Sequence, residues 1–148
     1  MAEDRIADHD WAVITCERKV GRSADEVWTQ IGGFGALSAF LPVSCTMLAG
    51  DGGVGSVRLV RDSIVEPMVA ATARSYTYSQ TKGPMEPFSY HGTLAVEPED
   101  AASRIVYTLV YNQSSMDEPR RKAERESISA RFTAVVEAMK AAVEARNP

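Results

Sequence analysis

Apolar and polar residues alternate with a period of two between Val43 and Tyr111. Such alternation is typical of β-strands, because successive strand side chains point to opposite faces of a sheet. It predicts six strands joined by short turns rich in glycine, proline, aspartate and serine: Val43–Ala49, Val54–Arg61, Ile64–Ala70, Ala73–Gln80, Phe88–Glu97 and Arg104–Tyr111. An earlier run of β-forming residues, Trp11–Val20, predicts one more strand ahead of them.

Two short helices are predicted between the first strand and the others. The segment Ser23–Glu26 is a capping box, a serine followed three residues later by a glutamate, so a helix is expected to open there and to run to about Ile31. A second short helix is predicted over Phe34–Leu41, because Pro42 would stop it.

The longest helix is predicted from Pro119 onward and covers about 27 residues at the C-terminal end. Its apolar residues recur at spacings of three and four and therefore form a single stripe: Ile128, Phe132, Val135, Val136, Met139 and Val143. A helix with one apolar stripe must pack that stripe against another layer.

These elements predict an α+β fold. Successive strands with short connections pair antiparallel, and a sheet of this size curls. We therefore expect a curved antiparallel sheet of about seven strands wrapped around the long C-terminal helix, with two short helices after the first strand. The gap between sheet and helix is expected to remain as a cavity, lined by inward strand side chains and by the helix stripe.

Composition narrows the class of protein. The 148 residues suit one domain spanning 1–148, in which residues 1–10 are expected to be flexible. The formal net charge of -4 argues against a nucleic-acid partner, which usually requires a basic face. Neither a signal peptide nor an apolar run of membrane-spanning length is visible, so we expect a cytoplasmic protein that does not associate with a membrane.

Cysteine and histidine usage predicts no metal site. Cys16 and Cys45 are not part of a C-x-x-C motif, and two buried free thiols are expected rather than a disulfide. His9 and His91 lack neighbouring ligands at the spacing of a zinc site. The G-x-G-x-x-G run at 50–55 precedes a predicted strand, so it indicates a hairpin turn rather than a dinucleotide site, and no cofactor is expected.

Two polar residues occupy apolar positions of the strand pattern. Glu66 shares its phase with Ile64 and Met68, and Tyr90 shares its phase with later apolar residues of its strand. A buried carboxylate is costly unless it is paired or protonated, so an inward Glu66 is a candidate functional group. Two plainer interpretations remain open: Glu66 lies at the sheet rim in a salt bridge, and Tyr90 is an ordinary core tyrosine.

Other candidates are less well defined by their pattern. Arg58 lies in a strand whose two phases are equally apolar, so its direction is undecided. Tyr76 and Tyr78 share a phase and either line the cavity or form an exposed ladder. Asn112 follows the last strand and either contacts a polar ligand or satisfies a turn. The remaining candidates for contact with a ligand come from the last strand and the helix stripe: Tyr107, Ile128, Phe132 and Val136.

The order of these features resembles a known superfamily. Ser23–Trp28 after the first strand, Phe40-Leu41-Pro42, Val54–Arg58, the Glu66 strand and Ser75–Tyr78 are similar to the START-like, or SRPBCC, proteins of helix-grip fold, in the polyketide cyclase/dehydrase branch. The resemblance covers about Trp11 to Val143. Within the superfamily the chain looks most similar to lachrymatory-factor synthases and abscisic-acid receptors.

The resemblance implies a role for three residues. In the synthases, an arginine of a V-G-x-V-R strand, a glutamate on the following strand and a tyrosine two strands further on act together, and the matching positions here are Arg58, Glu66 and Tyr90. The resemblance therefore implies that Arg58 points inward. The connection between the Arg58 strand and the Glu66 strand, about Asp62-Ser63, is shorter here than the gate loop of the receptors and synthases, which argues against gating and leaves 82–87 as the candidate lid.

Three functions are compatible with this pattern. The first is a cofactor-independent enzyme of the lyase, isomerase or cyclase type, with Glu66 as general acid/base and Arg58 and Tyr90 stabilising an oxyanion. The second is a non-catalytic carrier of a small hydrophobic or amphipathic organic ligand. The third is an interaction module without a cavity, which the many small strand residues disfavour. We expect a monomer or a homodimer.

Overall fold

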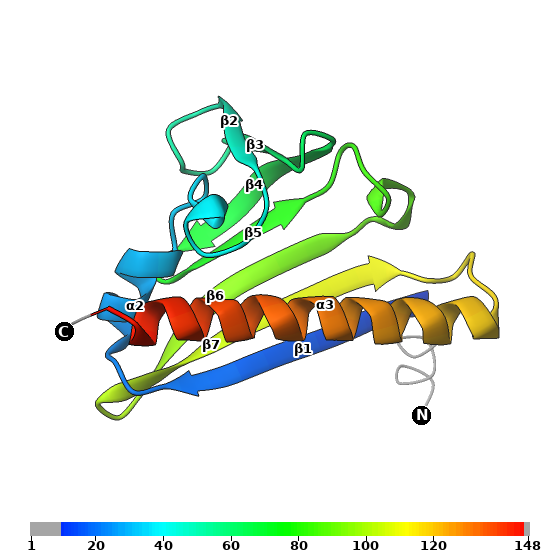
Figure 1. Ribbon diagram of the computed structural model, residues 1–148. Coiled ribbons are helices and arrows are strands. Elements are labelled where there is room, and N and C mark those ends of the chain that lie inside the picture. Colours follow the sequence, from blue (N-terminus) through cyan, green and yellow to red (C-terminus); the bar gives the residue numbers. More distant parts are fainter. Residues whose placement is uncertain (1–9, 147–148) are drawn as a thin grey trace.

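The computed structural model describes residues 10–146. It consists of one seven-stranded antiparallel sheet and a long C-terminal helix, which confirms the predicted fold (Figure 1). The predicted flexible segment 1–10 lies, apart from Asp10, outside the described residues. No helix within 10–146 is both long enough and apolar enough to cross a membrane.

The strands follow the order β1-β7-β6-β5-β4-β3-β2, so the first strand pairs with the last. Their bounds are β1 (Trp11–Val20), β2 (Cys45–Ala49), β3 (Val57–Val60), β4 (Ile64–Thr72), β5 (Ser75–Ser79), β6 (His91–Glu99) and β7 (Ala102–Asn112). Register shifts interrupt the pairing of β2 with β3 and of β4 with β5. Such irregularities bend a sheet locally, and in Figure 1 the β2–β4 side curves away from the long helix.

The long helix α3 (Glu118–Glu144) packs its apolar stripe on the sheet, beside β1 and β7 (Figure 1). Asp117 caps its first turn by accepting a hydrogen bond from the Arg120 backbone N–H at 3.0 Å. Five residues of the stripe are buried: Ile128, Phe132, Val136, Met139 and Val143. They meet the inward side chains of β1 and β7, and this contact forms the core.

The predicted capping box opens helix α2 (Ala24–Ile31), where Ser23 Oγ accepts a hydrogen bond from the Glu26 backbone N–H. The second predicted helix, Phe34–Leu41, is shorter than expected. It contains only the 3₁₀ turn η1 (Leu37–Ala39), because glycine is frequent just before it and lowers helix stability. A further 3₁₀ turn, η2 (Glu86–Phe88), precedes β6.

Strand β3 is also shorter than its predicted range, because the backbone turns at both ends. Gly55 and Arg61 have φ angles of 92° and 55°, which are incompatible with a strand. The glycine-rich segment 50–55 connects β2 to β3, so it is a hairpin connection as predicted. Both cysteines are free thiols; Cys16 is buried, whereas Cys45 is only partly buried.

Candidate functional site

Arg58 and Glu66 form an ion pair inside the protein. The register of β3 and β4 places them directly opposite each other. Arg58 Nε donates a hydrogen bond to Glu66 Oε1 at 2.9 Å, and the two side chains are 1% and 9% exposed. The connecting turn contains only residues 61–63, so one tight hairpin positions both charges.

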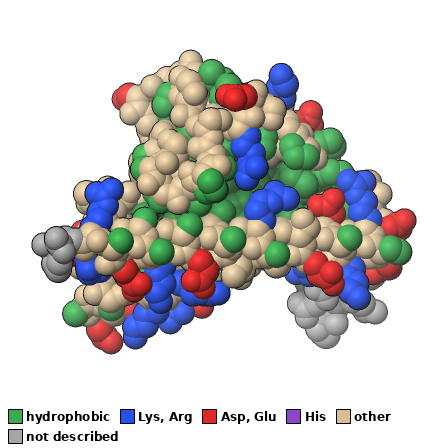
Figure 2. All heavy atoms as spheres, in the orientation of Figure 1, with side chains coloured by type: hydrophobic (Ala, Val, Ile, Leu, Met, Phe, Trp, Pro, Cys, Tyr) green, Lys and Arg blue, Asp and Glu red, His purple; other side chains and the backbone are tan. Residues whose placement is uncertain are grey.

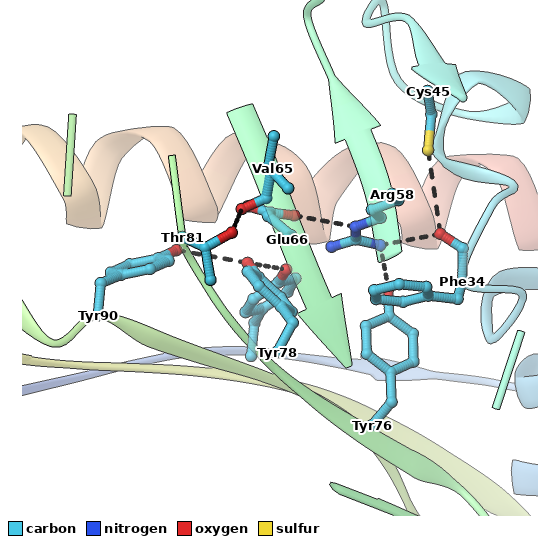
Figure 3. Close-up of polar contacts among 10 residues, drawn as sticks. Phe34, Cys45, Arg58, Val65, Glu66, Tyr76, Tyr78, Thr81 and Tyr90 are labelled. Atoms are coloured by element: carbon cyan, nitrogen blue, oxygen red, sulfur yellow. Dashed lines mark hydrogen bonds and ion pairs between the residues drawn. The ribbon is translucent and has the colours of Figure 1, made fainter. Parts of the chain in front are cut away.

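The Arg58 guanidinium lies in an aromatic cage formed by Phe34, Tyr76 and Tyr78 (Figure 3). Its central carbon is 4.2 Å from the ring centre of Phe34, 4.7 Å from that of Tyr78 and 5.4 Å from that of Tyr76. These distances allow cation–π attraction. Nη1 donates to the Phe34 carbonyl oxygen at 3.0 Å and to the Tyr76 hydroxyl at 3.1 Å.

One nitrogen of Arg58 remains available to a ligand. Within residues 10–146, Nη2 has no hydrogen-bond partner, and it is not among the fully buried polar atoms without one. The same holds for Glu66 Oε2. The pair therefore offers one donor and one acceptor to the space beside it.

Burial controls the protonation of this pair. Burial lowers the pKa of Arg58, but the electrostatic effects of Tyr76 and Glu66 raise it well above its usual value, so the guanidinium stays charged. Burial raises the pKa of the Glu66 carboxyl, and the charge and hydrogen bond of Arg58 only partly reverse this, leaving it above 4.5. A carboxyl group balanced in this way is suited to accept and return a proton.

Three tyrosine hydroxyls gather beside the pair. Tyr78 Oη lies 2.6 Å from Tyr107 Oη and 3.3 Å from Tyr90 Oη. Burial raises the pKa of all three phenols above the usual value, so they remain protonated. The cluster is therefore a set of hydrogen-bond donors at neutral pH.

The pair and the tyrosines line one cavity, whose volume is about 110 Å³. The polar part of the wall consists of Arg58, Glu66, Tyr78, Gln80, Tyr90 and Tyr107. The apolar part consists of Leu37, Leu41, Val43, Val60, Ile64, Pro84, Met85, Phe132 and Val135, and two arginines, Arg61 and Arg131, complete the lining. This volume exceeds the roughly 30 Å³ share of one water molecule several-fold.

Two irregular segments cover the cavity. Leu37 and Leu41 come from the η1 region, and Pro84 and Met85 come from the predicted lid segment 82–87. Gln80 fixes the second of these, because its Oε1 accepts a hydrogen bond from the Met85 backbone N–H at 2.8 Å.

The structure brings most of the predicted residues together. Arg58, Glu66 and Tyr90 line the cavity with Tyr78, Tyr107 and Phe132. Tyr76 contacts Arg58 without being part of the lining.

Three predicted ligand contacts lie elsewhere. Asn112 belongs to the outward phase of β7, and its Oδ1 accepts a hydrogen bond from the Ser114 backbone N–H at 2.8 Å, so it serves a turn. Ile128 and Val136 face the sheet core, with exposures of 1% and 0%, instead of the cavity.

One lining residue of the long helix is not predicted from the sequence. Arg131 reaches the cavity from α3, whereas Val135 belongs to the predicted apolar stripe and lines the cavity as well. The only signal for Arg131 is its position next to Phe132, at the edge of that stripe.

Gly92 determines the position of Tyr78, because the two residues pair across β5 and β6. A Cβ atom at Gly92 would lie 2.5 Å from both Cζ and Oη of Tyr78. We expect Gly92→Ala to displace the ring and to lower the free energy of unfolding by about 1–3 kcal/mol, the usual cost of overpacking. Urea unfolding and near-ultraviolet circular dichroism of the tyrosines measure both effects.

Gly21→Ala is the matched control, because an added Cβ there has no atom within 4 Å. Equal stability of the two variants would show that Tyr78 moves without cost and that Gly92 does not position it.

Within residues 10–146, no group of three histidine, cysteine, aspartate or glutamate side chains is arranged to hold a metal ion.

A protein-family comparison matches residues 12–144 to the family described as polyketide cyclase / dehydrase and lipid transport. No curated protein matches the chain significantly.

Solved structures share the fold at low sequence identity. A protein from Nitrosospira multiformis is 20% identical, with a TM-score of 0.76, over 92% of this chain and 100% of that one. Norcoclaurine synthase from Thalictrum flavum is 20% identical, with a TM-score of 0.72, over 95% of this chain and 91% of that one. Ara h 8.0201 is 17% identical, with a TM-score of 0.69, over 92% of this chain and 99% of that one.

Proposed function

Since the chain belongs to the polyketide cyclase / dehydrase and lipid transport family, within the superfamily that its sequence resembles, we propose that it is a cofactor-independent enzyme acting on a small organic molecule. The ligand is partly apolar and carries a carbonyl or similar oxygen. The observation that carries the proposal is the buried Arg58–Glu66 pair, whose remaining donor and acceptor are available beside an apolar cavity. Proton transfer leading to isomerisation, dehydration or intramolecular cyclisation suits these groups.

The proposed step is proton abstraction next to a carbonyl group. Glu66 Oε2 takes the proton from the carbon, and the C–H electron pair moves to form an enolate, whose negative charge rests on the carbonyl oxygen. Arg58 Nη2 and a hydroxyl of the tyrosine cluster, Tyr90 or Tyr78, donate hydrogen bonds to that oxygen. In an isomerisation, Glu66 returns the proton to another carbon. In a dehydration, the C–O bond of a β-hydroxyl group breaks as the enolate collapses to an alkene, and Glu66 passes its proton to the departing oxygen, which leaves as water. Neither route changes the redox state.

A structural neighbour supports the class of ligand. Norcoclaurine synthase from Thalictrum flavum has a structure in complex with dopamine and hydroxybenzaldehyde, which are small oxygenated aromatic molecules. The cavity here, with its apolar wall and tyrosine hydroxyls, fits a molecule of that kind.

A carrier without catalysis is the second candidate. It is favoured by the hydrogen bond between Arg58 and Glu66, which satisfies much of the site in the absence of a reacting molecule. In a carrier, the same pair would orient the polar end of the ligand.

Deuterium exchange separates the two functions. Small aryl ketones and aldehydes with an exchangeable α-hydrogen are incubated with the protein in D₂O, and mass spectrometry follows exchange, while protein NMR follows binding. We expect binding at the cavity and exchange above the buffer rate, both lost in Val135→Trp, which fills the cavity. Val13→Trp is the control, because Val13 is 55% exposed.

Binding without exchange for every compound would support the carrier and reject the enzyme. Absence of any binding would reject both.

A further inference from the structure

Two arginines lie at the mouth of the cavity. Arg61 comes from the turn after β3, and Arg131 comes from the middle of α3; both line the cavity and both are exposed. Figure 2 shows basic side chains above the middle of α3, where the surface is hollowed and hydrophobic side chains lie beneath. The net charge of the chain is -4, so the positive charge at the mouth is opposite in sign to that of the protein as a whole.

These two arginines lack the partners that most arginines have. Within residues 10–146, neither the Arg61 nor the Arg131 side chain makes an ion pair or a hydrogen bond, whereas the following arginines each contact a carboxylate: Arg18, Arg22, Arg58, Arg74, Arg104, Arg120 and Arg121. Their charges are therefore available to a ligand.

The backbone at Arg61 is unfavourable for an arginine. Arg61 and Asp62 have φ angles of 55° and 60°, and the Ser63 N–H donates to the Val60 carbonyl oxygen at 3.2 Å, which closes a tight hairpin turn. Asparagine and glycine are preferred where both central residues have positive φ. Arg61 therefore holds a backbone conformation that costs free energy for a residue with a Cβ atom.

Arg131 lines the cavity from the middle of α3 and is itself exposed, so it stands at the edge of the opening. Its charge also acts on the Tyr90 hydroxyl: burial raises the pKa of Tyr90, and Arg131 is among the groups that lower it.

Among the described residues that line the cavity, the only other charged groups are Arg58 and Glu66, and they are paired with each other. Arg58 is neutralised by Glu66, and a second anion beside that carboxylate would be repelled. A negatively charged group on the ligand therefore finds its favourable position at the mouth, with the apolar part directed inward.

We propose that the molecule bound in this cavity is an amphipathic anion, whose carboxylate or phosphate group is held at the mouth by Arg61 and Arg131. This inference rests on the proposed function, because it assumes that the cavity binds a small organic molecule. Guanidinium groups are suited to hold such an anionic group, since they bind carboxylate and phosphate oxygens through paired hydrogen bonds.

Matched probes test the inference. NMR titration at low salt compares 3-phenylpropanoate, 3-phenylpropyl phosphate and the neutral 3-phenylpropanamide. We expect the better anion to bind at least about tenfold more tightly than the amide, with a preference that falls as salt is added. Comparison of the two anions decides between carboxylate and phosphate.

Variants assign the preference to the two arginines. Arg61→Asn keeps the turn, and Arg131→Gln keeps the helix, so both are expected to fold. Each should weaken binding of the anion by about tenfold and leave binding of the amide unchanged. Arg125→Gln is the charge-matched control, because Arg125 lies on the same helix outside the cavity lining.

Equal affinity for anion and amide, or equal weakening of both probes by the variants, would overturn this inference and leave the proposed function intact. If neither the anions nor the amide bind, both are rejected.

Discussion

Replacing Glu66 by glutamine is expected to slow the proposed proton transfer by about 10²–10⁴-fold, the usual contribution of a general acid/base. Glutamine has nearly the same shape and retains an oxygen that can accept the 2.9 Å hydrogen bond from Arg58 Nε. The fold and ligand binding should therefore survive, whereas the group that takes the proton is lost. Deuterium exchange of a bound ketone and NMR titration of the same ketone measure the two properties separately.

Glu97→Gln is the matched control, since Glu97 is exposed on β6 and does not line the cavity. It should exchange deuterium at the wild-type rate. If Glu66→Gln keeps the wild-type rate as well, Glu66 is not the base.

The pH dependence follows from the raised pKa of Glu66. Burial raises this pKa above 4.5, and only the ionised carboxylate can act as a base. The exchange rate should therefore rise with pH through that raised pKa and then level off, and Glu66→Gln should lack the rise.

The free energy of unfolding should change with pH in the opposite direction. Because the pKa of Glu66 is higher in the folded protein than in the unfolded chain, its protonated form contributes stability in full below the unfolded-state pKa of about 4.3. This contribution is lost as the pH rises through the folded-state pKa. Wild type should therefore lose stability relative to Glu66→Gln over that range.

Replacing Arg58 by methionine is expected to lower the free energy of unfolding by about 3–5 kcal/mol, because it leaves a buried carboxylate without its counter-charge. The substitution removes the charge and hydrogen bond that lower the pKa of Glu66, so that pKa should rise further. It also removes the contacts of the guanidinium with the aromatic cage. Urea unfolding at neutral pH measures the loss.

The double variant Arg58→Met with Glu66→Leu should recover most of this stability, because an apolar pair can replace a buried ion pair at little cost. Arg104→Met is the control for an arginine at the surface: its contacts with Glu17 and Glu99 are exposed to solvent, and ion pairs of that kind contribute little to stability. A cost for Arg58→Met no greater than that of Arg104→Met would contradict the importance of the buried pair.

Strand periodicity was sufficient to predict the sheet and the inward direction of Glu66, one of the two charged residues of the buried pair. Glu66 is buried as its phase predicts. Tyr90 is also buried, although it lies just outside a strand. Ser89, with a φ of 50°, turns the chain before it, and β6 starts only at His91. The side chain keeps the inward phase because Tyr90 continues directly into the strand.

Periodicity could not decide the direction of Arg58. Val57 and Leu59, in the other phase of β3, are partly buried rather than exposed, so both faces of this short strand carry apolar residues. Burial of an arginine depends on the aromatic cage and on Glu66, which come from other segments. Pairwise contacts of this kind are invisible in the alternation of a single strand.

Helical periodicity in α3 is limited in the same way, because it does not predict which residues reach the cavity. Its stripe identifies residues that face the sheet, such as Ile128 and Val136, because they repeat with the helical period. The cavity lies to one side of that contact, so it is reached by one edge of the stripe, Phe132 and Val135, and by Arg131 just outside it. Their role depends on where the sheet curves away, which is a tertiary property.

The pairing of the first strand with the last has a consequence for synthesis on the ribosome. β1 emerges first but can pair only with β7, and Cys16 contacts the carbonyl oxygen of Ser129, 113 residues later in the chain. Closing so long a loop delays folding until β7 and α3 have been synthesised. The nascent β1 therefore keeps unpaired edges until then, and the cavity beside α3 forms only after that helix has emerged.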